Sequence, residues 1–183
     1  MRETTPLLEA VENQRYDAVK LLLELGADPN KPYKPGCMVL PYAVYKNDLN
    51  IVSLLLKNKA DPNCMNFTSP ILMAIWKNNI DMVKMLLEAG ASINYCSCSG
   101  YLIKYSLNSK EIFEYLVEKH LDMPSDRKWL QNLLCENFES DRVRDLIHRP
   151  DFPKIARNLK CNQAIRYFKE RGDHKTVNIL KLV

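Results

Sequence analysis

The chain has 183 residues, 46% of them hydrophobic and 26% charged, a balance that is typical of a folded globular chain and excludes wholesale disorder. The formal net charge of +4 arises from residues 125–183, which carry a net +5 against −1 for residues 1–124. No apolar run approaches the roughly 18 residues of a membrane span, and the first residues lack the apolar core of a secretory signal. We therefore expect a cytoplasmic protein that does not contact membranes; the nucleus or a host cytoplasm is the alternative.

One pattern of apolar residues recurs along the whole chain. An alanine in a short apolar stretch is followed 12 residues later by a leucine in three successive segments (Ala10 and Leu22, Ala43 and Leu55, Ala74 and Leu86). The leucine then recurs after 30, 30 and 34 residues, at Leu116, Leu146 and Leu180. An apolar residue precedes each of the six by three positions: Val19, Val52, Val83, Phe113, Val143 and Val177. This spacing is typical of the buried face of a helix, so we expect a series of helix–turn–helix units.

Polar residues and glycines in the first three units indicate where their helices begin and end. Thr5-Pro6 and Ser69-Pro70 each place a capping hydroxyl before a proline at the first helical position, where proline is tolerated. Asp17, Asn50 and Asp81 are expected to open the second helices. Gly26 and Gly90 are expected to end them in the left-handed conformation, a place that Lys59 and His120 occupy in units two and four.

These segments resemble the ankyrin repeat, which has a period of about 33 residues and a T-P-L-x-x-A opening. The first carries Thr5-Pro6-Leu7 with Ala10, then Val19-x-x-Leu22-Leu23 and Gly26-Ala27-Asp28-x-Asn30. The second segment matches through Ala43, Val52, Leu55-Leu56 and Ala60-Asp61-x-Asn63. The third segment matches through Ser69-Pro70-Ile71, Ala74, Val83, Leu86-Leu87 and Gly90-Ala91-x-x-Asn94. The resemblance extends over residues 4–94 and weakens towards 124.

The resemblance implies an all-α solenoid of stacked helix–turn–helix units with projecting β-turns or hairpins. We expect one ankyrin-repeat domain over 1–183, with repeats at 4–32, 37–65, 68–96 and 99–124, the fourth with a shortened first helix. Divergent helix pairs at 125–150 and 154–183 would follow, interrupted by Pro150 and Pro153. The last pair would close the array as a C-terminal cap, because an open end exposes an apolar face.

The resemblance also implies that a partner protein binds in the groove lined by the first helices and on the turns between repeats. Two residues past the repeat alanine, this chain has Glu12-Asn13, Tyr45-Lys46 and Trp76-Lys77. We expect the aromatic residues and lysines to form a ladder, because tyrosine and tryptophan dominate binding hot spots. The turns add five further candidates: Tyr33, Lys34, Met65, Phe67 and Tyr95. The alternative is that Tyr45 and Trp76 pack between repeats and that Phe67 folds back onto its neighbour.

Signals for catalysis or metal binding are weak. Cys96 and Cys98 are the only close pair among six cysteines, whereas structural zinc sites use two such pairs or a pair with two histidines. The histidines, His120, His148 and His174, show no ligand spacing, and no phosphate-binding glycine loop is present. We therefore expect reduced thiols, no metal, no cofactor and no enzymatic activity.

These observations predict a monomeric, non-catalytic protein-binding module. One alternative is an anionic ligand, either an acidic protein or nucleic acid, attracted by the basic residues of 154–181. Those residues alternate with apolar ones, as on the solvated face of an amphipathic helix, so nucleic acid is not the partner we expect. A second alternative is a host-directed viral or bacterial ankyrin adaptor that uses residues 125–183 to recruit another partner.

Overall fold

The computed structural model describes residues 4–34, 36–66, 68–93, 102–121, 128–137, 139–156 and 162–182. The chain forms two compact units, residues 1–98 and 99–183. Helices make up the described part of both units, which contains no β-strand; Lys34 and Cys37 form an isolated antiparallel bridge. This architecture agrees with the all-α class expected from the sequence.

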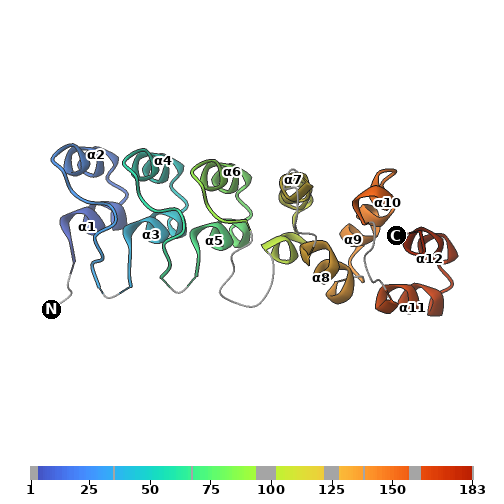
Figure 1. Ribbon diagram of the computed structural model, residues 1–183. Helices are drawn as coiled ribbons and strands as arrows, with labels where there is room; N and C mark the ends of the chain where they lie inside the picture. The colour runs from blue at the N-terminus through green and yellow to red at the C-terminus, as the bar shows by residue number, and fades with distance from the viewer. Residues whose placement is uncertain are drawn as a thin grey trace. The chain divides into compact units, whose positions relative to one another are not determined.

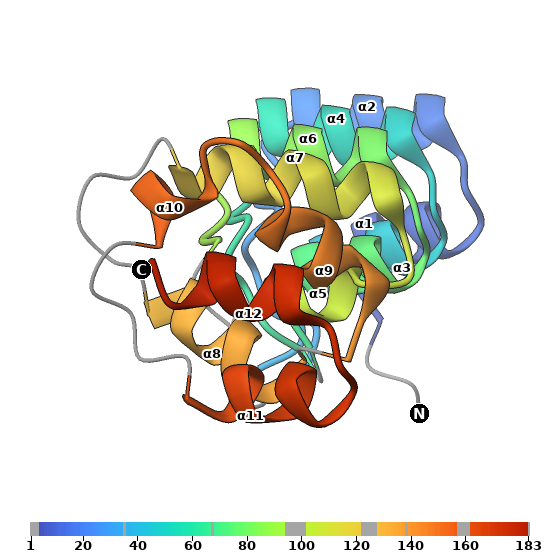
Figure 2. The ribbon, with the colours of Figure 1, turned by 90° about the vertical axis from the view of Figure 1, so that its right-hand side faces the viewer.

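Unit 1 consists of three helix pairs that stack side by side (Figure 1). The first helices, α1, α3 and α5, form one layer and the second helices, α2, α4 and α6, form the other (Figure 2). The pairs are α1 (Pro6–Glu12) with α2 (Tyr16–Glu24), α3 (Val39–Tyr45) with α4 (Leu49–Lys57), and α5 (Pro70–Trp76) with α6 (Ile80–Glu88). The predicted helix–turn–helix units are therefore confirmed over this part of the chain.

Four of the six helices in unit 1, namely α1, α4, α5 and α6, begin at a short polar side chain that caps them. The Thr5 and Ser69 hydroxyl oxygens accept hydrogen bonds from the backbone N–H groups of Leu8 and Leu72, as predicted. The prediction was wrong by two residues for α4 and α6, where the caps are Asp48 and Asn79. Asp17, Asn50 and Asp81 lie instead inside the first turns, where Asp17 and Asp81 place a negative charge near unpaired N–H groups.

The second helices of unit 1 end in one shared geometry. Gly26, Lys59 and Gly90 have φ angles of 87°, 64° and 94°. The N–H of the alanine after each of them donates to the carbonyl of the repeat leucine five residues earlier, at 2.9–3.0 Å. These bonds close a Schellman-type C-cap, which needs a left-handed residue. Lys59 therefore holds a conformation that favours glycine.

The corresponding prediction for His120 was wrong. His120 lies within α7 (Lys110–Leu121), is 2% exposed and has its Nδ1 atom 2.8 Å from the Leu116 carbonyl. Its ring packs against Trp129 with the centroids 4.8 Å apart. α7 continues past the position at which the second helices of the earlier repeats end, because the His120 side chain is packed in the core of unit 2 and does not lie at a turn.

The repeated apolar pairs form the cores of both units. The predicted valines and Phe113 are all buried, and so are the repeat leucines at 55, 86, 116, 146 and 180. Leu22 is the exception and is only half-buried. It belongs to the pair α1–α2, which lies at the end of the stack in unit 1 (Figure 1), so a neighbouring pair covers only one side of it.

Asparagine side chains link successive pairs of unit 1. Asn30 donates from Nδ2 to the Lys59 carbonyl at 2.8 Å and accepts at Oδ1 from the Asp61 N–H at 2.8 Å. Asn63 repeats both bonds one unit later, to the Gly90 carbonyl and from the Ser92 N–H. Because each amide bridges two backbone groups of the next repeat, these bonds fix the spacing between neighbouring pairs.

Unit 2 is built from shorter and less regular elements. The predicted shortened first helix of the fourth repeat is a 3-10 turn, η1 (Leu102–Ser106), followed by α7. The expected pairs at 125–150 and 154–183 appear as α8 (Lys128–Glu136) with α9 (Asp141–Ile147), and α11 (Asn162–Glu170) with α12 (His174–Leu180). A four-residue helix not foreseen, α10 (Phe152–Ile155), lies between them, where Pro153 sits in the first turn and is tolerated.

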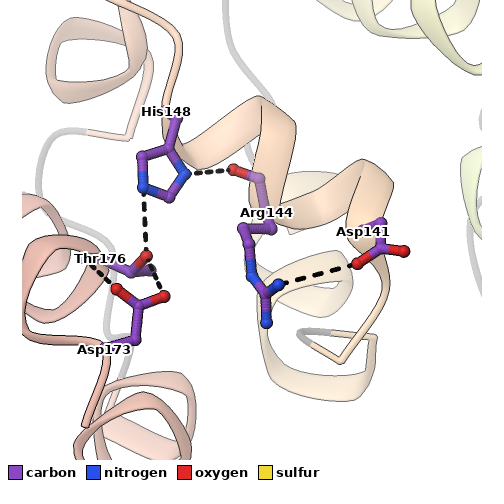
Figure 3. Close-up of polar contacts among 5 residues, drawn as sticks. All are labelled: Asp141, Arg144, His148, Asp173 and Thr176. Atoms are coloured by element: carbon purple, nitrogen blue, oxygen red, sulfur yellow. Dashed lines mark hydrogen bonds and ion pairs between the residues drawn. The ribbon is translucent and has the colours of Figure 1, made fainter.

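A polar network ties α12 to α9 (Figure 3). Nδ1 of His148, at the end of α9, donates to the Arg144 carbonyl at 2.8 Å, and its Nε2 lies 3.2 Å from the Thr176 hydroxyl oxygen. Thr176 is fully buried; its hydroxyl donates to Asp173 at 2.7 Å and its N–H donates to the other carboxylate oxygen. His148, the C-cap of α9, and Asp173, the N-cap of α12, therefore join the two helices through Thr176.

Candidate functional site

The first helices of the second and third repeats present their last residues to solvent. In α3 and α5, most residues before the C-terminus are buried, including Ala43 and Ala74, which are fully inaccessible. Two positions later the chain reaches Tyr45 and Trp76, which are 56% and 59% exposed. Each helix then ends at a lysine C-cap, Lys46 or Lys77. The same point of successive repeats therefore carries an exposed aromatic ring followed by a cation.

The aromatic rings and lysines of this face contact one another across repeats. The Lys77 ammonium of the third repeat lies 4.8 Å from the centroid of the Tyr45 ring in the second repeat. Lys46 lies 5.9 Å from the centroid of Tyr42, whose ring meets Tyr45 edge-on at 6.2 Å. Ammonium groups at these distances are attracted by the ring electrons. We call the surface formed by Tyr42, Tyr45, Lys46, Trp76 and Lys77 the aromatic–lysine face.

Tyr42 belongs to this face although it was not among the residues expected there. It lies one helical turn before Tyr45 in α3, so the two rings project from the same side of the helix. The signal available in the sequence was this i, i+3 spacing.

The turn residues are placed less uniformly. Tyr33 is half-buried and Lys34 exposed, in the turn closed by the bond from the Tyr33 N–H to the Cys37 carbonyl. Burial raises the pKa of the Tyr33 phenol, and Cys37, Tyr42 and Glu12 raise it further. Met65 is half-buried. Phe67 and Tyr95 lie outside the residues that the structure describes.

Comparison with known proteins gives the family of the first unit. A family model for ankyrin repeats in many copies matches residues 7–56 and 40–87. Residues 7–87 are ankyrin repeats. An ankyrin repeat protein of Acanthamoeba polyphaga mimivirus is 28% identical to the chain over 139 residues. That alignment covers 73% of this chain but 36% of the relative, so the chain spans about a third of the relative's length.

The two lysines of the aromatic–lysine face have no carboxylate partner within the described part of the chain. Lys46 and Lys77 contact tyrosine rings but form no ion pair there, whereas Lys20 on α2 pairs with Glu24 at 3.9 Å. In the first ankyrin repeat, Asn13 holds the position of the two lysines, and Glu12 holds the position of Tyr45 and Trp76. The face is therefore positive over repeats two and three and negative over repeat one.

The basic residues that follow the ankyrin repeats are partly used within the chain. Arg166 pairs with Glu170 at 3.0 Å, and the Arg171 guanidinium stacks on Tyr167 at 3.8 Å from the ring centroid. Two of the basic residues of this region, Arg157 and Lys160, lie outside the described residues. The described basic side chains lie along α11 and α12 as expected for amphipathic helices.

Unit 2 contains a hollow of about 330 Å³ between α7 and α9. Phe113, Val117 and Leu146 form its apolar floor. Charged side chains of both signs surround it: Glu114, Glu118, Arg142, Asp145 and Arg149. This mixed rim favours neither an anionic nor a cationic ligand.

The described residues offer little for catalysis or for metal binding. Burial raises the pKa of the Cys64 thiol to about 12, so it is not a thiolate nucleophile at neutral pH. Within the described ranges, no three His, Cys, Asp or Glu side chains gather closely enough to hold a metal ion. The pair Cys96 and Cys98 lies outside those ranges. Among the described helices, none has the length and hydropathy needed to cross a membrane.

Proposed function

We propose that the chain is a non-catalytic module that binds a partner protein through the aromatic–lysine face, with Tyr33, Lys34 and Met65 at its margin. Phe67 and Tyr95, in the turns that follow, remain candidates from the sequence alone. The observation that carries this proposal is the alignment of exposed Tyr45 and Trp76 at one position of adjacent ankyrin repeats, with Lys77 over the Tyr45 ring. Ankyrin repeats generally serve protein–protein interaction, and no cofactor is needed for that role.

Exposure argues against the alternative that these rings only fill the contact between repeats. A ring that serves packing alone is expected to be mostly buried, whereas more than half of each of these two side chains is accessible to solvent. Exposed aromatic residues that lie together on a folded surface favour a binding site. A monomer in the cytoplasm remains our expectation for the free protein.

Substitution of Trp76 separates binding from folding. We expect Trp76→Ala to abolish capture of the partner from a lysate of the cells that produce the chain, and to change the free energy of unfolding by less than about 0.5 kcal/mol, because the side chain is mostly exposed. Leu21→Ala is the matched control, since Leu21 is 54% exposed but lies on α2 in the other layer. Unfolding of Trp76→Ala would instead assign the ring to packing.

A second function is a host-directed adaptor in which residues 125–183 recruit another partner. The likeness to a viral ankyrin repeat protein supports this alternative, and the hollow beside α9 is a place where a second protein could bind. An adaptor predicts two independent sets of captured proteins, one lost in Trp76→Ala and another lost in Arg142→Glu, which reverses a charge on the rim of the hollow. Loss of one and the same set in both variants would contradict it.

A further inference from the structure

We infer that the occupant of the aromatic–lysine face is an acidic, extended segment of a partner protein, whose carboxylates lie against Lys46 and Lys77. This inference rests on the proposed function and adds the chemistry of the partner. It follows from charge complementarity, because both ammonium groups lack a carboxylate partner in the described part of the chain. An ammonium group that lies over an aromatic ring can still bind an anion, because only one side of it faces the ring electrons.

The two lysines are held in place before a partner arrives. Each ammonium rests on the ring of a tyrosine in α3, at 5.9 Å for Lys46 and 4.8 Å for Lys77. A lysine side chain that is free in solution loses rotamer entropy when it binds an anion, and part of that loss has already occurred here. Carboxylates of the partner therefore meet cations whose positions are set by the fold.

The spacing of the repeats gives a register for the partner. Lys46 and Lys77 follow adjacent, mutually packed helices α3 and α5, and packed helices are about 8–10 Å apart. A partner segment in the extended polyproline II conformation advances about 3.1 Å per residue with three residues per turn, so its side chains three residues apart point to the same side and span about the same distance. We expect acidic residues at positions i and i+3 of the partner, with an apolar residue between them against Tyr45 and Trp76.

The first repeat sets one end of the acidic segment. Glu12 ends α1 at the position that Tyr45 and Trp76 hold in α3 and α5. Its carboxylate repels an acidic chain that extends over α1, so the partner's acidic residues are confined to repeats two and three. The same argument predicts that Glu12→Lys tightens the binding of acidic peptides, because it lengthens the row of cations.

A display selection with random 12-residue peptides on the full chain tests the inference without knowledge of the natural partner. We expect enriched peptides to carry Asp or Glu three residues apart around an apolar residue. For a synthetic peptide from that set, fluorescence anisotropy should show affinity about tenfold weaker for Lys46→Ala/Lys77→Ala and a few times tighter for Glu12→Lys. The control Lys20→Ala/Lys57→Ala removes the same charge from α2 and α4 and should leave affinity within about twofold.

The outcomes separate this inference from the proposed function. Enrichment of neutral or basic peptides that lose binding in Trp76→Ala would overturn the acidic partner and leave the binding face intact. Peptides that bind Trp76→Ala as well as wild type, or no enrichment at all, would count against both. A 20-nucleotide single strand that binds the wild type and is lost in Lys46→Ala/Lys77→Ala would replace the protein occupant with nucleic acid.

Discussion

The ammonium of Lys77 lies 4.8 Å from the centre of the Tyr45 ring, so a side chain of the third ankyrin repeat rests on a side chain of the second. This contact joins neighbouring repeats at adjacent rather than equivalent positions, since Lys77 corresponds to Lys46, and it makes one continuous surface from residues 32 positions apart in the sequence. Because the backbone positions of both repeats are set by the packed helices beneath them, the surface is formed before any partner binds.

Replacement of Lys59 by glycine should stabilise unit 1. Lys59 has a φ of 64°, in the left-handed region that costs a residue with a Cβ about 1–2 kcal/mol. Glycine removes this cost but gains entropy in the unfolded chain, so we expect a net gain of about 0.5–1 kcal/mol and a melting temperature higher by about 1–4 °C. Gly90→Ala, at the equivalent cap with a φ of 94°, should lower the melting temperature. A lower value for Lys59→Gly would contradict the C-cap assignment.

Removal of the Asn63 side chain should loosen the contact between repeats two and three. Asn63→Ala deletes the bonds to the Gly90 carbonyl and from the Ser92 N–H, which together contribute about 1–2 kcal/mol. Urea unfolding followed by circular dichroism measures the loss. The matched control is Asn13→Ala, which removes one exposed bond to the Glu9 carbonyl within a single repeat and should cost less than about 0.5 kcal/mol. Equal losses for the two variants would show that the bridging bonds do not hold the repeats together.

The sequence predicted the frame of unit 1 well, because the alanine and leucine positions repeat with little change in spacing. The sequence could not predict the asparagine bridges. It shows that Asn30 and Asn63 recur at the same place in their repeats, but the backbone groups that they bind lie in the next repeat. For the aromatic–lysine face, the sequence indicated which residues align but not that Lys77 contacts the ring of the preceding repeat. Tyr42 could have been identified from its i, i+3 spacing to Tyr45, whereas the helical state of His120 depended on packing, which spacing alone does not reveal.

The Thr176 hydroxyl should contribute to the attachment of α12. Thr176→Val keeps the shape of this fully buried side chain but removes its bond to Asp173 and its contact with His148 (Figure 3), at a cost of about 1–2 kcal/mol. Thr176→Ser retains the hydroxyl and loses a methyl group. Amide hydrogen exchange in α12 distinguishes the two variants. Faster exchange in Thr176→Val than in Thr176→Ser supports the polar network, whereas the reverse order would show that the methyl group of Thr176 stabilises α12 through packing.

Acid should weaken unit 2 through Asp173. Hydrogen bonds from the Thr176 hydroxyl and N–H lower the pKa of this carboxyl, and an Arg149 hydrogen bond lowers that of Asp151 in the same way. A lowered pKa in the folded state gives stability that is present above about pH 3.9, the value for an unfolded aspartate, and that is lost as the pH falls through the folded value. Asp173→Asn should therefore show a smaller loss of melting temperature between pH 6 and pH 3 than the wild type. Asp141→Asn, which removes an exposed carboxylate of the same unit, should behave like the wild type. If Asp173→Asn loses as much melting temperature in acid as the wild type, the Asp173 carboxylate does not cause the acid sensitivity.

The most direct test of the binding face is photo-crosslinking from within it. Tyr45 is replaced by p-benzoyl-phenylalanine, and in a second protein the same analogue replaces Leu21 on the opposite layer, where the native side chain is 54% exposed against 56% for Tyr45. After irradiation in a lysate of the producing cells, we predict a discrete adduct with another protein at position 45 that is absent at position 21 and disappears with Trp76→Ala. Equal adducts at both positions, or adducts at position 45 that persist in Trp76→Ala, would contradict the account.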